Sequence, residues 1–189
     1  LEYRGYDSAG IAVVDPANLL AVHKAAGKLK VLVESLKGSS PAGLSGIGHT
    51  RWATHGSPTE LNAHPHADCT QDIVIVHNGI VENYLALKEQ LQKEGHTFAS
   101  ETDSEVIAHL IESFVAEGLA FEDAARLTAQ RIQGAQAVVA MNVKEPGRLV
   151  AFRLGNAGGI TVGYGNGEMF LASDLPALLP YTSQVAFLA

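Results

Sequence analysis

Four short polar clusters hold most of the side chains that could do chemistry. They are EYRGYDSAG at 2–10, HTRWATHG at 49–56, NAHPH at 62–66, and VHNG at 76–79 together with ETD at 101–103. Their arginine, histidine, asparagine and aspartate side chains can bind carboxylates, amides and ammonium groups. The residue types alone leave three chemistries open: metal coordination, covalent catalysis and the binding of a small polar ligand.

Spacing disfavours metal coordination by the histidines of these clusters. The candidates are five residues between positions 49 and 77, His49, His55, His64, His66 and His77. A zinc site needs three or four converging ligands, and the HxH pair at 64–66 is a weak match to any such pattern. We therefore predict no metal ligand. Two further histidines, His96 and His109, are expected to be surface or packing residues on helices.

The single cysteine, Cys69, excludes a disulfide framework and is compatible with a reducing cytoplasm. It lies between a proline-containing loop and a strand, and no catalytic-cysteine signature surrounds it. A base need not be near in sequence, so a nucleophile stays possible in principle. The simpler interpretation is a small loop residue.

Three further positions each have a structural interpretation and a functional one. Asn78-Gly79 ends an apolar strand, and Asn78 could cap the next helix or present its amide with a backbone N–H as an oxyanion hole. Asp103 could be an acid in a first helical turn or bind an ammonium group. Arg51 could form a surface ion pair or grip a carboxylate with two N–H groups. No single residue by itself decides between its structural and its functional interpretation.

The hydrophobic pattern predicts strands at both ends of the chain and helices in the middle. Strands are expected at 10–14 and 72–78, with a short helix over 28–37, and later as the consecutive runs AVVAMNV, RLVAFRL, GITVGYG, EMFLASD and VAFLA. GYGNG at 163–167 lies between two of these runs and is expected to be a hairpin turn.

The middle of the chain has helical periodicity. A stripe formed by Ile80, Tyr84, Leu87 and Leu91 predicts a helix that begins at Ile80 and ends near Gly95. TDSE at 102–105 has the spacing of a capping box and predicts the start of a second helix. A third helix is predicted over 121–133.

Composition bounds the class of protein. The 189 residues are 47% hydrophobic and 17% charged, which suits one globular domain. No apolar run approaches the ~20 residues that a membrane span needs. The net charge of −7 without a basic cluster argues against nucleic acid and anionic membranes as partners.

The order of elements indicates an α+β fold with antiparallel sheets. The sequence contains no GxGxxG or GxxxxGK[ST] motif that would indicate nucleotide binding.

Taken together and in this order, the clusters resemble a known family. LEYRGYDSAGIAV, HTRWATHG, NAHPH, VHNGI followed by EN, and ETDSEVIAH resemble the glutaminase (type 2 glutamine amidotransferase) domains of the glucosamine-6-phosphate synthase family, the isomerizing glutamine:fructose-6-phosphate aminotransferases. The resemblance covers essentially the whole chain. Amidophosphoribosyltransferases are a poorer match, because their motif differs where this chain has YRGYDS at 3–8, and Trp52 also favours the synthase family.

The resemblance implies a fold and a reaction. The fold is a four-layer αββα sandwich of the N-terminal-nucleophile hydrolase type, with two antiparallel sheets between helical layers. The reaction is hydrolysis of the side-chain amide of L-glutamine, without a cofactor. The ammonia would pass to a sugar-isomerase domain of the same parent chain, which converts fructose 6-phosphate to glucosamine 6-phosphate. A homodimeric full-length enzyme and a cytoplasmic location are also implied.

The resemblance assigns the glutamine-binding residues. Arg51 and Thr54 would bind the α-carboxylate of glutamine, with His55 in the same loop. Asp103 would bind the α-ammonium group, helped by the carbonyl of Gly79. Arginine suits the first task because its planar guanidinium can donate two parallel hydrogen bonds to a carboxylate.

It also assigns residues around the reacting amide. Asn78 Nδ2 and the Gly79 N–H would form the oxyanion hole, and Arg4 would lie next to the nucleophile, where positive charge favours a thiolate. Trp52 is similar to the tryptophan that gates the path of ammonia to the sugar domain. Two histidines are implied as structural supports, His64 and His77.

One part of the family pattern is missing. The family's nucleophile is an N-terminal cysteine whose own α-amino group is the general base, and Cys69 cannot replace it because Cys69 has no free α-amino group. We expect the glutaminase domain over 1–189 to lack the first strand, which carries that cysteine, and the last strands, and to be inactive as it stands. The alternative is a non-catalytic glutamine-binding or regulatory module that has lost its nucleophile.

Overall fold

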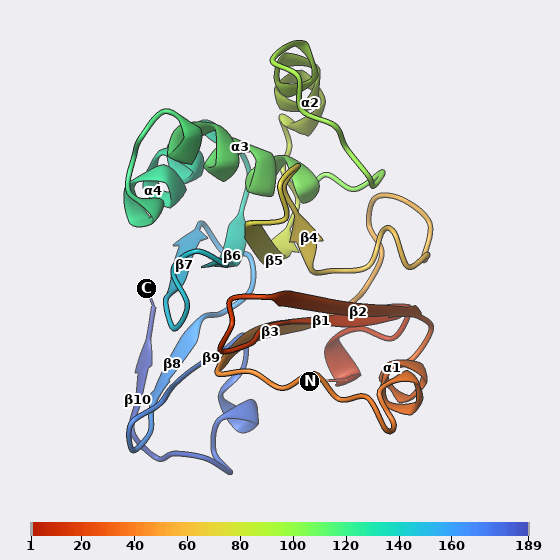
Figure 1. Ribbon diagram of the computed structural model, residues 1–189, viewed down its shortest axis with the longest axis vertical. Coiled ribbons are helices and arrows are strands. Elements are labelled where there is room, and N and C mark those ends of the chain that lie inside the picture. The colour runs from red at the N-terminus through yellow and green to blue at the C-terminus, as the bar shows by residue number, and fades with distance from the viewer. Residues whose placement is uncertain (1, 189) are drawn as a thin grey trace.

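The strands of the protein form three antiparallel sheets in a computed structural model that describes residues 2–188 (Figure 1). The first has the order β2-β1-β3, from β1 (Ser8–Val14), β2 (Leu20–Ala26) and β3 (Ser45–Arg51). The second has the order β4-β5-β6-β7, from β4 (His66–Ala67), β5 (Ile73–Gly79), β6 (Gln136–Asn142) and β7 (Leu149–Leu154). The third has the order β10-β8-β9, from β8 (Thr161–Tyr164), β9 (Met169–Ala172) and β10 (Val185–Phe187).

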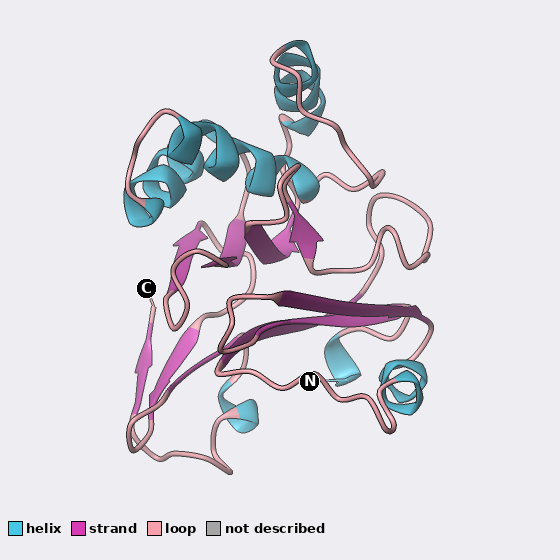
Figure 2. Ribbon diagram, in the orientation of Figure 1, coloured by secondary structure: helices cyan, strands magenta, loops and turns pink. Residues whose placement is uncertain are grey.

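Four α-helices cover the outer faces of the first two sheets (Figure 2). They are α1 (Leu29–Ser35), α2 (Tyr84–Lys93), α3 (Glu105–Ala116) and α4 (Phe121–Arg131), and two 3₁₀ turns are η1 (Glu2–Arg4) and η2 (Leu175–Ala177). Within residues 2–188, none of the helices has both the length and the hydrophobicity to span a bilayer.

The layers follow from the alternation of side chains along the strands. In β5, Ile73 and Ile75 are buried against the three helices α2, α3 and α4, whereas Val74 is buried against the first sheet. In β1, Ala12 and Val14 meet Val74 in that same inter-sheet core. The other face of the first sheet packs on α1. The chain therefore has the α/β/β/α layers expected for the N-terminal-nucleophile hydrolase type, and the expected α+β class is confirmed.

One expected feature differs, because the layer that contains β1 is divided. Its strands belong to two sheets, β2-β1-β3 and β10-β8-β9, where a single sheet was expected. The edge strands β3 and β9 do not pair with each other. Instead, residues of both strands line two cavities, of about 90 Å³ and about 280 Å³. Both facing edges thus border the same two cavities.

Strands β1 and β5 to β10 and the helix α1 lie where the hydrophobic pattern predicts them, β2, β3 and β4 were not predicted, and α2 starts later than predicted. The helix begins at Tyr84 instead of Ile80, and Ile80 is exposed. The backbone N–H groups of Val81 and Glu82 donate to Asp103 Oδ2 and to the carbonyl of Gln133, so the chain turns here before the helix starts. Asn78 is therefore not a helix cap. The third helix, α4, ends at Arg131, slightly earlier than predicted.

The predicted capping box at 102–105 is wrong. Ser104 takes the N-cap position of α3 and makes no side-chain capping bond. The carboxylate of Glu105 instead accepts the backbone N–H groups of Ala99 and Ser100, each at 2.7 Å. The acidic residue at the helix start therefore holds the preceding loop in place. The spacing of Thr102 and Glu105 in the sequence is the same for this role as for a capping box, so the sequence could not distinguish the two.

Candidate functional site

All four polar clusters converge on one cavity. The cavity has a volume of about 100 Å³ and lies between the end of β3, the end of β5 and the start of α3. Seven of the eight predicted site residues line it: Arg4, Arg51, Trp52, Thr54, Asn78, Gly79 and Asp103. The eighth, His55, lies at its margin, with Nδ1 3.8 Å from Asp103 Oδ1.

Arg51 is a buried arginine at the end of β3, and it shapes the loop that follows it. Its guanidinium donates to the carbonyl oxygens of His55, Gly56 and Ser57. These bonds fold residues 52–57 back over the strand end. A guanidinium has five N–H donors, so three such bonds leave it donors for a ligand in the cavity. Arg51 thus both builds the loop and keeps a positive charge in the wall of the cavity.

Asp103 is buried beside this positive charge. Its Oδ2 accepts the backbone N–H of Val81 at 2.7 Å, which ties the start of α3 to the segment after β5. Its Oδ1 is the oxygen nearer to His55. A buried carboxylate costs free energy unless a positive group or hydrogen-bond donors compensate it. The cavity therefore offers one anionic and one cationic wall to the same ligand.

Asn78 points toward the first sheet because strand alternation puts it on the same face of β5 as Val74. His49 Nε2 lies 3.0 Å from Asn78 Oδ1. Burial lowers the pKa of His49 to about 4, so the ring is neutral at pH 7 and donates from Nε2 to the amide oxygen. That bond fixes the orientation of the Asn78 amide and leaves its Nδ2 as the donor for a ligand.

Gly79 has a backbone conformation that only glycine adopts without strain. Its φ is +141°, and a Cβ at this position would lie 2.2 Å from the carbonyl oxygen of Ala135 and 2.8 Å from Gln136 Oε1. Glycine is therefore required both by the backbone angle and by the close approach of β6. Gly79 lines the cavity next to Asn78.

His77 holds the end of β5 through a buried network. The Ser104 hydroxyl donates to its Nδ1 at 2.8 Å, and its Nε2 donates to Gln136 Oε1 at 2.5 Å. Gln136 Nε2 in turn donates to the carbonyl oxygens of Ile80 and Gln133, each at 2.8 Å. Burial lowers the pKa of His77, and the neutral ring fits this pattern of donors and acceptors.

The histidines between positions 49 and 77 pack against one another instead of converging on a point. The ring of His64 lies 4.4 Å from that of His49 and 4.5 Å from that of His66, measured between centroids. Burial lowers the pKa of His66 to about 3. Within the described residues these histidines form no group that could hold a metal ion.

Arg4 connects the cavity to a second one beside it. Its side chain donates to the carbonyl of Ser173 at 3.2 Å and forms an ion pair with Asp174 at 3.7 Å. It lines both the site cavity and the cavity of about 90 Å³ between β3 and β9. The two cavities also share Asn78, so the amide of that residue faces a space continuous with the cleft between the two sheets.

Trp52 is exposed although it touches the cavity. The fractional exposure of the residue is 63%, and its ring lies 5.6 Å from the ring of Tyr6, which is also exposed. A large apolar pair at the rim of a polar cavity is typical of a surface that another part of a protein covers.

Cys69 lies outside the site. It lines neither the site cavity nor the cavity beside it, and it contacts His96 and His109 on another part of the surface. Partial burial and the nearby charge of Glu112 raise the pKa of its thiol, which is the reverse of what an activated nucleophile needs. His96 follows α2 in a loop, so the expectation that it lies on a helix is wrong.

Several residues of the site are not apparent in the sequence as functional residues. Ser104 and Gln136 bond to His77, and Asn62 bonds to both the backbone and the carboxylate of Glu101. They are small or neutral polar residues, whose types occur throughout a chain. Asn62 and Ser104 lie within sequence motifs that were singled out, but their partners lie far away in sequence, so local spacing did not reveal their roles.

The chain matches known proteins over its whole length. Residues 49–180 match the family described as Glutamine amidotransferase domain. Over 188 residues, the chain is 50% identical to a glutamine–fructose-6-phosphate aminotransferase [isomerizing] of Methanothermobacter thermautotrophicus and 51% identical to the protein of that name from Aquifex aeolicus. The match includes 100% of this chain and 31% of each relative, so the chain spans under a third of their length.

A solved structure shares the fold. The glutamine phosphoribosylpyrophosphate amidotransferase of B. subtilis, complexed with ADP and GMP, aligns with a TM-score of 0.80 at 26% sequence identity. The alignment covers 99% of this chain and 39% of that one.

We predict that Gly79→Ala destabilises the protein more than Gly118→Ala. Gly118 also has a positive φ, +95°, but a Cβ there would meet nothing within 4 Å. Both variants carry the conformational strain, whereas only Gly79→Ala adds the overpacking, which costs about 1–3 kcal/mol. Urea unfolding of the two variants measures the difference. Equal losses of unfolding free energy in the two variants would show that the backbone at β6 moves to accommodate the added Cβ at no energetic cost.

Acidification should destabilise the protein through its buried histidines. The pKa of His49 is about 4 in the folded state against an ordinary value of 6.5, so the unfolded chain binds a proton that the folded one excludes. Stability from this residue is present above pH 6.5 and is lost as pH falls toward 4, by up to about 1.4 kcal/mol per pH unit. Urea unfolding at pH 7, 6 and 5 should show a shallower loss for His49→Gln. Titration of the His49 ring by NMR near its ordinary value would contradict this.

Proposed function

Because the chain belongs to the glutamine amidotransferase domain family, we propose that its cavity binds L-glutamine and that the complete protein hydrolyses the side-chain amide. The observation that carries this proposal is the convergence of Arg51, Asp103 and Asn78-Gly79 on one cavity. One cationic wall, one anionic wall and an amide-binding corner match the three polar groups of glutamine. Residues 1–189 constitute the glutaminase domain in this proposal.

Recognition of the amino acid uses the two charged walls. Arg51 and Thr54 bind the α-carboxylate, and the loop that Arg51 shapes brings His55 next to it. Asp103 binds the α-ammonium group, with the Gly79 carbonyl as a second acceptor. Charge-assisted hydrogen bonds of this kind are shorter and stronger than neutral ones. Together they would fix the backbone of the ligand and leave its amide pointing toward Asn78.

The amide corner stabilises charge during the reaction. Attack on the amide carbon produces a tetrahedral intermediate with a negatively charged oxygen, which Asn78 Nδ2 and the Gly79 N–H would bind. His49 holds the Asn78 amide in the orientation this requires, with Nε2 at 3.0 Å from Oδ1. Loss of one such donor typically costs about 3 kcal/mol of transition-state stabilisation.

The nucleophile is outside these 189 residues in this proposal. The resemblance gives the family an N-terminal cysteine whose α-amino group serves as base, and Cys69 lines neither the site cavity nor the one beside it. The cleft between β3 and β9 would accept a further extended segment that carries this cysteine, with Arg4 and Asn78 at its end. The chain alone would then bind glutamine without hydrolysing it.

The names of the relatives suggest how the ammonia is used. We propose that a sugar-isomerase domain in the remainder of the protein takes up the ammonia and converts fructose 6-phosphate to glucosamine 6-phosphate, with Trp52 between the two domains. The exposure of Trp52 and Tyr6 supports a contact at this rim. We place the enzyme in the cytoplasm, where Cys69 stays reduced, and expect the complete protein to be a homodimer.

A non-catalytic glutamine-binding module is the competing function. Release of ammonia and glutamate from glutamine by the complete protein separates the two, because a binding module shows no turnover. No specific feature of the cavity favours the non-catalytic role.

Asp103→Asn should weaken L-glutamine binding about 10- to 100-fold, which corresponds to the 1.5–3 kcal/mol of a hydrogen bond to a charged group. Isothermal titration calorimetry on this chain measures the effect. A glutamine analogue without the α-amino group should bind both proteins equally, since it offers nothing to Asp103. The matched control is Asp123→Asn, an exposed carboxylate on α4 that should bind glutamine like the parent sequence. Equal glutamine affinity in Asp103→Asn would overturn the assignment.

In the complete protein, Trp52→Ala should keep the rate of glutamine hydrolysis within about twofold of the parent rate. It should reduce the fraction of the released ammonia that reaches the sugar. The side chain is exposed, so its removal costs little stability. The measurement is glutamate released against glucosamine 6-phosphate formed. The control is Leu44→Ala, an even more exposed apolar residue that does not line the cavity. Unchanged coupling in Trp52→Ala would count against the gating role.

A further inference from the structure

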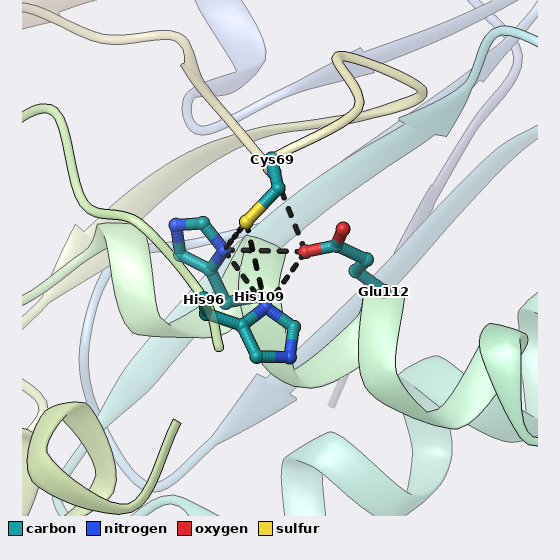
Figure 3. A group of neighbouring side chains, drawn as sticks. All are labelled: Cys69, His96, His109 and Glu112. Carbon is teal, nitrogen blue, oxygen red and sulfur yellow. Dashed lines mark hydrogen bonds and ion pairs between the residues drawn. The ribbon is translucent and has the colours of Figure 1, made fainter. Parts of the chain in front are cut away.

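A second cluster of reactive side chains lies outside the glutamine site (Figure 3). It consists of Cys69, from the loop between β4 and β5, His96, from the loop after α2, and His109 and Glu112, from one face of α3. One ligand atom from each residue lies within 4.8 Å of all the others. In Figure 3 the thiol, both rings and the carboxylate point toward a common centre.

Five of the six distances between these atoms approach those of a tetrahedron around one ion, and the sixth, between Cys69 Sγ and Glu112 Oε2, is at most 4.8 Å. His96 Nδ1 and His109 Nδ1 are 3.3 Å apart, and they lie 2.9 and 3.2 Å from Glu112 Oε2. The Cys69 sulfur lies 3.6 and 3.5 Å from the two nitrogens. Zinc with bonds of about 2.0–2.1 Å to N and O and about 2.3 Å to S would place N and O donors about 3.3 Å apart and S about 3.5 Å from them.

Hydrogen bonding alone explains this arrangement poorly. His109 Nε2 lies 3.5 Å from Glu105 Oε1, so the ring proton belongs on Nε2 and Nδ1 carries a lone pair. That lone pair faces another imidazole nitrogen, a sulfur and a carboxylate oxygen. One proton can bridge only one pair of these atoms at a time, whereas a cation at the centre contacts all four. A carboxylate behind a metal-binding histidine is also the usual way of fixing its tautomer.

We propose that Cys69 Sγ, His96 Nδ1, His109 Nδ1 and Glu112 Oε2 bind one Zn²⁺ ion. Thiolate and imidazole ligands in a tetrahedral arrangement select zinc over magnesium or calcium. The ion would have four protein ligands and no open position, which is typical of structural sites. None of the four residues lines the glutamine cavity, so the site is separate from the proposed reaction.

The zinc ion would fix the segment that presents Asp103. It connects the β4–β5 loop, the α2–α3 connection and α3, which are also joined by the bonds from the Cys69 N–H to Glu112 Oε2 and from the Thr97 N–H to Cys69 Sγ. From His109 the contacts continue to Glu105, whose carboxylate accepts the N–H groups of Ala99 and Ser100. Those residues lie four and three positions before Asp103 in the same loop. Zinc would thus stabilise the loop without taking part in chemistry.

The test measures metal binding directly. Zinc is quantified by mass spectrometry in protein purified without chelators, and Co²⁺ is then exchanged into the site as a spectroscopic probe. We expect about one zinc per chain. The cobalt form should show tetrahedral d–d bands and a thiolate-to-cobalt charge-transfer band. Cys69→Ser should lose that band and weaken zinc binding more than about 100-fold, beyond the 10- to 100-fold typical of outer hydrogen-bond partners.

Matched variants keep the proposal falsifiable. His96→Gln should lose zinc affinity as Cys69→Ser does, whereas His23→Gln, on β2 and outside the cluster, should bind zinc like the parent sequence. Zinc should raise the unfolding temperature of the parent and of His23→Gln only. A parent protein without the charge-transfer band, or a Cys69→Ser variant that binds zinc unchanged, overturns the proposal. Glutamine titration is a separate measurement, so failure of the glutamine proposal leaves this result interpretable.

Discussion

The hydrogen bonds around His77 are the interaction on which the site depends. Its ring joins the end of β5 to the start of α3 through Ser104 and to the start of β6 through Gln136. Buried polar groups of this kind are costly unless every one has a partner, so the network tolerates few alternatives. Because Asn78 and Gly79 follow directly, the network sets where the amide-binding corner of the cavity lies.

The layers of the fold explain why the corner forms at this strand end. Strand β5 is buried on both faces, with Ile75 toward the helices and Val74 toward the first sheet. The same alternation continues into the polar residues, so His77 faces α3 while Asn78 faces His49 on β3. A single strand therefore supplies the structural network on one face and the ligand-binding amide on the other.

The connection between α2 and α3 serves two sites at once. It ends at Asp103 in the glutamine cavity, and it begins with His96 in the four-residue cluster at the surface. Glu105 lies between them and contacts His109 on one side and the backbone before Asp103 on the other. An ion bound in the cluster would therefore act on the cavity through the order of this loop.

The α+β class and seven of the ten strands could be predicted from the sequence, because hydrophobic periodicity is local, whereas β2, β3 and β4 could not. The sequence could not place Ile80 outside a helix, because a hydrogen bond between Val81 and Asp103 decides that turn. Nor could it show that Cys69 meets His109, since packing of distant segments creates that contact. Local spacing encodes elements and motifs, whereas burial and long-range hydrogen bonds, which only the tertiary structure supplies, decide which side chains share a site.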